Sequence, residues 1–177
     1  MTTVHLVCGF LGSGKTTFAE ALALREGAIR FSIDELYLRL FADGPTYDLD
    51  HGAQERLRDV LNDIWPQIVR AGVSVVLDFG FWTRPVRDEV RARAVSAGAS
   101  ARLYWLRCPD EVAVARCLQR NGKPGSFLIS AEGFEWLKQH FHPPEPDEPC
   151  EIINSEAQLS PNEALPDSRP GTIRTRS

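Results

Sequence analysis

Short apolar runs alternate with amphipathic segments along the first 154 residues of the chain. Apolar runs rich in β-branched residues are typical of buried strands, and apolar positions three and four residues apart are typical of helices. These patterns predict strands over residues 4–8, 28–33, 73–77, 101–106 and 151–153. They predict helices over residues 15–24, 53–71, 83–98, 109–122 and from 130 onward. We therefore expect an α/β fold, with helices on both faces of a parallel sheet and a binding crevice at the carboxyl ends of its strands.

Several local signals set the expected helix ends. Gly72 supplies a stop for the helix over 53–71, and Pro66 inside that helix could kink it. Ser130 is a candidate N-cap, because Ile129 before it and Phe134 after it have the spacing of a hydrophobic staple.

The segment Gly9–Thr16 fits the phosphate-loop pattern Gly-x-x-x-x-Gly-Lys-Ser/Thr at every fixed position, and it follows the first predicted strand. In such a loop backbone N–H groups surround the phosphates, the lysine contacts the terminal phosphates, and the Ser/Thr hydroxyl can bind Mg²⁺. A dinucleotide-binding turn is the competing interpretation, but the glycines do not have the spacing Gly-x-Gly-x-x-Gly. We expect nucleoside triphosphate contacts from Gly9, Leu11, Gly12, Ser13, Gly14, Lys15, Thr16 and Thr17.

Two aspartates follow predicted strands at the same edge of the sheet. Asp34 follows the second strand and is a candidate base for deprotonating a substrate hydroxyl. The alternative is that Ser32 or Asp34 caps a helix through residues 35–40. Asp78 follows the third strand and is a candidate for holding Mg²⁺ with Thr16 or for contacting the substrate. Its alternative is simply to end the strand.

Arginines lie near this edge in two places. Phe81, Arg84 and Arg87 belong to a segment that could bind a polar ring or an anionic substrate, or could equally be core and solvated helix surface. Arg116 and Arg120 stand four residues apart before a loop rich in turn formers. They could form a lid that binds ATP and stabilises transition-state charge, or they could be ordinary surface arginines.

Composition narrows the class of protein. The 177 residues are 43% hydrophobic and carry a net charge of −4, which suits one domain and lacks the basic excess of a dedicated nucleic-acid binder. We expect a domain over 1–154 and a disordered or added tail over 155–177, in a cytosolic protein with no membrane segment. The four cysteines are expected to be reduced thiols. His140 and His142 could bind a metal, but a surface turn is the favoured interpretation of this segment.

These motifs together resemble the small P-loop kinases of the nucleoside monophosphate kinase superfamily, among them gluconate kinase, chloramphenicol phosphotransferase, the zeta toxin and polynucleotide kinase. The runs 77–82 and 141–148 are most similar to the bacterial predicted-kinase group, and the likeness spans about residues 4–153. The resemblance implies a three-layer P-loop fold with a five-stranded parallel sheet and a short lid. It also implies ATP as donor with Mg²⁺, Asp34 as general base, and Arg116 and Arg120 as lid residues.

The acceptor of the phosphate is left open by these motifs. Polynucleotide kinases have an arginine three positions after the base, where this chain has Tyr37, and no guanine-reading element is present. The leading hypothesis is a kinase of a small hydroxylated molecule whose site includes Asp34, Tyr37 and Asp78. A kinase of polynucleotide 5′-hydroxyls and a nucleotide-binding regulatory module are the alternatives.

Overall fold

The computed structural model describes residues 1–41 and 51–155, with the side chain of His51 excepted. Five strands form one parallel sheet in the order β2-β3-β1-β4-β5. The strands are β1 (Thr3–Gly9), β2 (Ile29–Ser32), β3 (Val75–Gly80), β4 (Ser100–Arg107) and β5 (Glu151–Asn154). The helices are α1 (Lys15–Glu26), α2 (Ile33–Phe41), α3 (His51–Arg70), α4 (Arg84–Ser96), α5 (Asp110–Arg120) and α6 (Ala131–Lys138). The predicted α/β class and five-stranded parallel sheet are confirmed.

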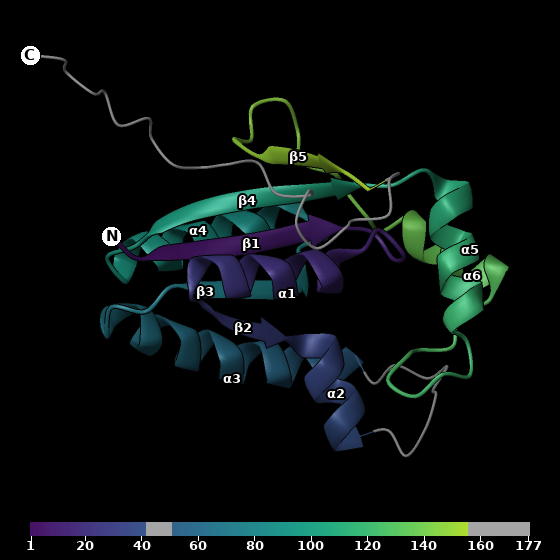
Figure 1. Ribbon diagram of the computed structural model, residues 1–177, viewed down its shortest axis with the longest axis horizontal. Coiled ribbons are helices and arrows are strands. Elements are labelled where there is room, and N and C mark those ends of the chain that lie inside the picture. Colours follow the sequence, from purple (N-terminus) through teal and green to yellow (C-terminus); the bar gives the residue numbers. More distant parts are fainter. Residues whose placement is uncertain (42–50, 156–177) are drawn as a thin grey trace, which may run out of the picture.

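Apolar side chains cover both faces of this sheet. Leu6 and Leu77 pack with Trp65 of α3 and Val90 of α4 on one face. On the other face, Val7 belongs to a cluster that includes residues of α1. Because neighbouring side chains along a strand point to opposite faces, near-continuous apolar runs such as β1 are needed to fill both layers. The arrowheads of the strands point toward the end of the molecule where α2, α5 and α6 lie (Figure 1).

The strand ends differ from the predicted ones by up to three residues, and two of these differences affect the site. The strand predicted to run to residue 33 ends at Ser32, because the hydroxyl of Ser32 accepts a hydrogen bond from the backbone N–H of Glu35 at 3.3 Å and begins α2. Asp34 therefore lies in the first turn of a helix. Strand β3 continues to Gly80, since Ser32 of β2 pairs with Asp78 and Cys8 of β1 pairs with Gly80. Asp78 is thus inside a strand and not after it.

The other local predictions concern caps and side-chain chemistry. The hydroxyl of Ser130 accepts a hydrogen bond from the N–H of Gly133 at 3.0 Å, and Ile129 packs in the same cluster as Phe134, as the staple predicts. Helix α3 runs through Pro66 without interruption. All four cysteines are free thiols. Among the described residues no three His, Cys, Asp or Glu side chains are grouped to hold a metal ion.

The tail predicted over 155–177 lies outside the described residues except for Ser155. Within the described ranges, no helix combines the length and the apolar character needed to cross a membrane.

Candidate functional site: a phosphate loop with two flanking aspartates

The phosphate loop connects β1 to α1 and is held by close packing. Gly12 and Gly14 have φ values of 73° and 88°, in the left-handed region that favours glycine. A Cβ placed on Gly12 would lie 2.2 Å from the carbonyl oxygen of Ala113 in α5, so the loop and α5 approach each other too closely for any side chain. The loop leads directly into the N-terminus of α1, where the helix dipole favours an anion.

The loop contains polar groups that suit a phosphate ligand. The hydroxyl of Ser13 is buried and has no hydrogen-bond partner among the described residues. The ammonium of Lys15 donates a hydrogen bond of 2.8 Å to the carbonyl oxygen of Phe10. Burial lowers the pKa of Lys15, and the charges of Asp78 and Asp34 partly offset this shift. Phosphate oxygens would supply both an acceptor for Ser13 and negative charge for Lys15.

Asp78 lies beside the start of α1. Its side chain is buried, it accepts a side-chain hydrogen bond from Thr16, and its Oδ2 lies 3.5 Å from Nη1 of Arg30. Burial raises the pKa of Asp78, while Lys15 and Arg30 act in the opposite direction. A hydroxyl next to a carboxylate is an oxygen-only pair of the kind that Mg²⁺ accepts, so Thr16 and Asp78 fit the predicted metal ligands. Arg30 was not among the predicted site residues, although a charged residue inside an otherwise apolar strand indicates a charged partner such as Asp78.

Asp34 and Arg120 complete the charged group around Lys15. The side chain of Asp34 is exposed to solvent, yet the surrounding protein limits its hydration and so raises its pKa. Lys15 and Arg120 act on Asp34 in the opposite direction, and Arg120 also lowers the pKa of Lys15. The folded chain therefore brings Asp34, Lys15, Asp78 and Arg120 close enough to influence one another.

Arg116 has different contacts from its predicted lid partner. Its guanidinium donates to the carbonyl oxygen of Gly12 at 3.3 Å, to the hydroxyl of Ser155 at 3.0 Å and to the carbonyl oxygen of Ser155 at 3.1 Å. Arg116 thus ties the phosphate loop to the chain that follows β5. Arg120, one turn further along α5, donates to the carbonyl oxygen of Arg116 at 3.3 Å.

Two residues predicted for the substrate site lie in the interior instead. Arg87 is fully buried, and its guanidinium donates to Glu148 at 2.8 and 2.5 Å and to the carbonyl oxygen of Phe81 at 3.0 Å. The hydrogen bonds from Arg87 lower the pKa of Glu148 to about 2. Phe81 is a core residue with a φ of 49°, and its carbonyl also accepts from the thiol of Cys8. Arg87 therefore has structural contacts in place of the predicted substrate contact, whereas Phe81, although a core residue, also lines the pocket described below.

The remaining predicted contact residues lie on α4, on α2, on α1 and in the phosphate loop. Arg84 is partly exposed and pairs with Glu145 at 2.5 Å and Asp147 at 2.7 Å, which leaves it bound to the segment before β5. Tyr37 is buried and its ring packs against Phe41 and Phe127. Thr17 is exposed on α1, and Leu11 is partly buried in the loop.

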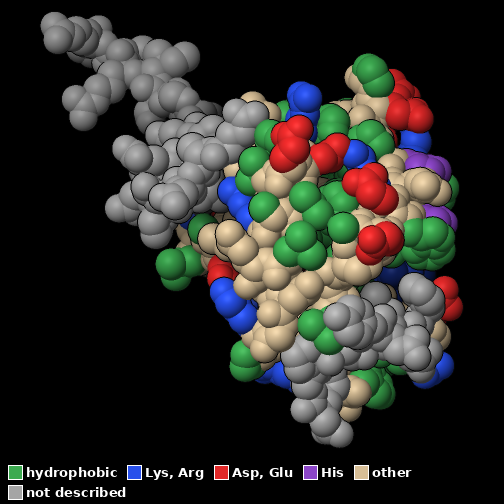
Figure 2. Space-filling view, turned by 90° about the vertical axis from the view of Figure 1, so that its right-hand side faces the viewer, with side chains coloured by type: hydrophobic (Ala, Val, Ile, Leu, Met, Phe, Trp, Pro, Cys, Tyr) green, Lys and Arg blue, Asp and Glu red, His purple; other side chains and the backbone are tan. Residues whose placement is uncertain are grey.

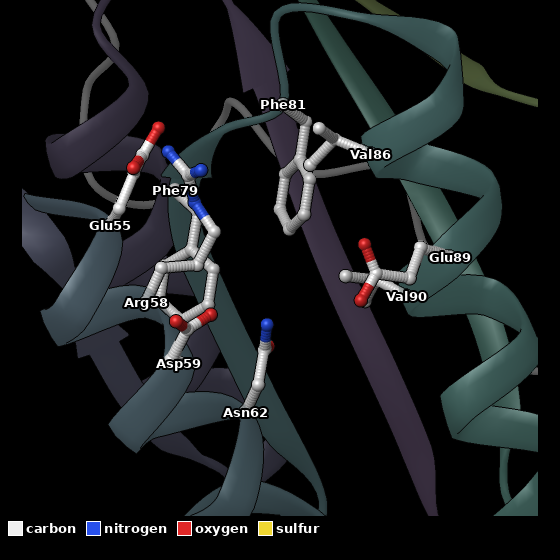
Figure 3. A pocket seen from close by; sticks show the side chains of 9 residues that line it. All are labelled: Glu55, Arg58, Asp59, Asn62, Phe79, Phe81, Val86, Glu89 and Val90. Atoms are coloured by element: carbon white, nitrogen blue, oxygen red, sulfur yellow. The ribbon is translucent and has the colours of Figure 1, made fainter. Parts of the chain in front are cut away.

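A pocket of about 250 Å³ lies between α3 and α4 above the end of β3 (Figure 3). Helix α3 contributes Glu55, Arg58, Asp59 and Asn62 to its lining, β3 and the residue after it contribute Phe79 and Phe81, and α4 contributes Val86, Glu89 and Val90. Phe81 belongs to the segment predicted to bind a substrate, whereas the α3 residues of the pocket were not predicted. Their position depends on packing between segments far apart in the chain.

A parallel sheet with a phosphate loop between β1 and α1, and an acidic residue in a neighbouring strand, defines a P-loop nucleotide-binding fold. A family model described as an AAA domain matches residues 4–144, and the chain belongs to this family. No curated protein matches the chain in sequence.

Solved structures of small kinases share this fold. A sugar kinase from Janibacter sp. HTCC2649 is 21% identical, with 89% of this chain and 88% of that chain covered and a TM-score of 0.62. A gluconokinase from Sinorhizobium meliloti 1021 is 18% identical, with 89% and 85% covered and a TM-score of 0.65. The APS kinase of Mycobacterium tuberculosis, in complex with AMPPNP and APS, is 16% identical, with 89% and 90% covered and a TM-score of 0.59. The chain therefore has the fold of the small P-loop kinases.

Proposed function

We propose that this protein is an ATP-dependent phosphotransferase that moves the γ-phosphate to a hydroxyl group of a small molecule. The observation that carries the proposal is the charged group around Lys15, in which an exposed aspartate in the first turn of α2, Asp34, lies close enough to the loop lysine for their charges to interact, together with Asp78 and Arg120. A nucleotide site needs only the loop and the metal ligands. A second, accessible carboxylate beside the loop adds a group able to act on an attacking hydroxyl.

Each residue of this group has a distinct role in the proposal. When bound, Mg-ATP supplies the phosphoryl group to be transferred. The loop N–H groups and Lys15 bind phosphate oxygens, and Thr16 with Asp78 would hold the metal. Asp34 accepts the proton of the acceptor hydroxyl, and its raised pKa makes it a better base than an ordinary aspartate. Arg120 adds positive charge near the transferred oxygens.

A small acceptor is supported over a polynucleotide. Where described residues are visible on the face toward which the strands point, acidic and basic side chains are interspersed among hydrophobic ones and form no continuous basic stripe (Figure 2). Tyr37, at the position where polynucleotide kinases have an arginine, is buried against other aromatic rings. The pocket between α3 and α4 also favours an enzyme with an acceptor over a purely regulatory nucleotide-binding module.

The test begins with a screen for ADP release from Mg-ATP in the presence of hydroxylated metabolites, antibiotics and 5′-hydroxyl oligonucleotides. With the acceptor found, Asp34→Asn should lower kcat by about 10²- to 10⁴-fold, the usual contribution of a general base, while ATP affinity changes little. The control is Asp63→Asn, which neutralises an exposed carboxylate of α3 that does not line the pocket. Full activity of Asp34→Asn with unchanged ATP binding would refute the proposal.

A further inference from the structure

Arg30 is a charged residue in a strand whose other side chains are apolar or small. Its side chain is only 17% exposed, although it belongs to β2 at the edge of the sheet (Figure 1). Arg30 pairs with Val76 of β3, two positions before Asp78, and residues two apart in a strand point to the same face. The guanidinium therefore lies beside Asp78 on the sheet face that α1 covers.

Three carboxylates from three different elements surround this guanidinium. Nη2 donates to Oε2 of Glu35 in α2 at 2.5 Å and lies 3.6 Å from Oε1 of Glu20 in α1. Nη1 lies 3.5 Å from Oδ2 of Asp78 in β3. The side chains of Glu20 and Glu35 are 59% and 41% exposed, whereas that of Asp78 is 4% exposed. Water can stabilise the two glutamates without Arg30, but it reaches Asp78 much less.

On the α2 side, Arg30 reaches the turn that carries the proposed base. Glu35 directly follows Asp34, and the backbone N–H of Glu35 donates to the hydroxyl of Ser32 at 3.3 Å. The first turn of α2 is thus joined to β2 twice, once through the backbone of Glu35 and once through its side chain. Asp34 lies between Ser32 and Glu35, so these two bonds limit how far its carboxylate can move relative to the strand.

On the β3 side, Arg30 reaches the proposed metal ligands, since Asp78 also accepts a side-chain hydrogen bond from Thr16. A guanidinium has its donors at fixed angles, so one arginine can hold two carboxylates in a set relation to each other. A lysine ammonium has the same charge without this fork geometry. Groups that orient metal ligands in this way commonly contribute about 10- to 100-fold to metal affinity or activity.

We propose that Arg30 is a positioning residue of the phosphoryl-transfer site, which fixes the metal ligand Asp78 and, through Glu35, the turn that carries Asp34. It acts through these carboxylates and not on the nucleotide or the acceptor directly. The roles of Asp34 and Asp78 are taken from the proposed function, but both effects of Arg30 can be measured without catalysis. The simpler alternative is that Arg30 only neutralises a buried charge, in which case Arg30→Lys would preserve every property.

The first measurement is the affinity of the full-length protein for a fluorescent ATP analogue, with Mg²⁺ and with EDTA in its place. Arg30→Met should leave the affinity in EDTA largely unchanged and reduce the gain from Mg²⁺ by about tenfold. Arg30→Lys should keep the urea midpoint near that of wild type, because the charge is retained, but recover only part of the Mg²⁺ gain. The control is Arg39→Met, which removes the exposed partner of Glu35 at 2.9 Å and should keep the full gain.

The second measurement is hydrogen exchange of the amides in the first turn of α2, in the protein without nucleotide. Arg30→Met and Glu35→Gln should each speed this exchange by about fivefold, the upper range for a partly exposed ion pair. Arg39→Met should change it by no more than about twofold, as expected for an i,i+4 pair on a helix surface.

A full Mg²⁺ gain in Arg30→Met, an Arg30→Lys variant that equals wild type in both measurements, or unchanged exchange in Arg30→Met and Glu35→Gln would each overturn the inference. If Arg30→Met does not fold, Arg30→Lys and Glu35→Gln still decide the question. Loss of the Mg²⁺ gain in a protein that transfers phosphate to no acceptor would support the role of Arg30 at the nucleotide site and refute the kinase. Phosphoryl transfer that requires Asp34 but is unaffected by Arg30→Met would support the kinase and refute the role of Arg30.

Discussion

Substituting Arg87 by methionine tests whether this arginine holds the fold together or binds substrate. Arg87 is fully buried on α4, and the side chain of its partner Glu148 is 1% exposed. The guanidinium also donates to the carbonyl oxygens of Phe81 and His142 at 3.0 and 2.9 Å. This one side chain therefore fixes both the turn after β3 and the segment that leads into β5.

The expected cost follows from the charge that is left behind. Methionine fills much of the same volume, but Glu148 remains buried with Arg91, at 3.0 Å, as its only other charged partner among the described residues. Removing one member of a buried ion pair usually costs about 3–5 kcal/mol. For a domain of this size that corresponds to a fall in Tm of roughly 10 °C, at about 2–4 °C per kcal/mol.

Urea unfolding followed by circular dichroism measures this loss, and Arg84→Met is the matched control. Arg84 lies on the same helix and pairs with the same segment, but its partners Glu145 and Asp147 are largely exposed. We expect the urea midpoint of Arg84→Met to stay close to that of wild type, since exposed pairs contribute little. An Arg87→Met variant that is as stable as wild type but has a raised KM for the acceptor would refute the structural role and restore the substrate role.

Two further predictions concern the phosphate loop and the core. Gly12→Ala should abolish ATP binding, measured with a fluorescent ATP analogue, and should cost about 3 kcal/mol, because left-handed strain adds to a backbone clash with Ala113. Gly27→Ala, where φ is 59° and the space is open, should cost only about 1 kcal/mol and bind ATP normally; equal effects at the two glycines would contradict the packing argument. Burial lowers the pKa of His5 from 6.5 to about 4, so the unfolded chain binds a proton that the folded chain does not between these pH values. The free energy of unfolding should therefore fall by up to about 3 kcal/mol from pH 6.5 to pH 4, relative to His5→Asn in urea titrations, and parallel pH profiles of the two proteins would show that His5 is not the cause.

Features that depend on neighbouring residues could be predicted from the sequence, and features that depend on contacts between distant segments could not. The phosphate loop, the separate strands and the Ser130 cap could be predicted because each depends on residues adjacent in the chain. The parallel pairing of the strands could be predicted because strands alternate with helices along the sequence. For the second strand, the alternative in which Ser32 caps a following helix is the one that the structure shows, because the Ser32 hydroxyl accepts from the N–H of Glu35 and Asp34 lies in the first turn of α2.

Arg87 could not be assigned from the sequence, because its partner Glu148 is 61 residues away. An arginine on a helix with other arginines predicts a solvated surface as readily as a binding site. The choice depends on how the segment before β5 folds back onto α4, which no local pattern determines. The burial of Asn62 could not be predicted for the same reason, because it depends on how α3 packs beside α4 and β3.

The central claim is that Asp34 and the phosphate loop together transfer a phosphoryl group to a hydroxyl. Phosphorus NMR of a reaction that contains Mg-ATP and the acceptor tests it most directly, because a phosphate ester and inorganic phosphate give separate signals. We predict that the wild-type protein converts ATP to ADP with a matching amount of phosphate ester, and that Asp34→Asn binds ATP but forms almost no ester. Release of inorganic phosphate without an ester, or equal ester formation by Asp34→Asn, would contradict the claim.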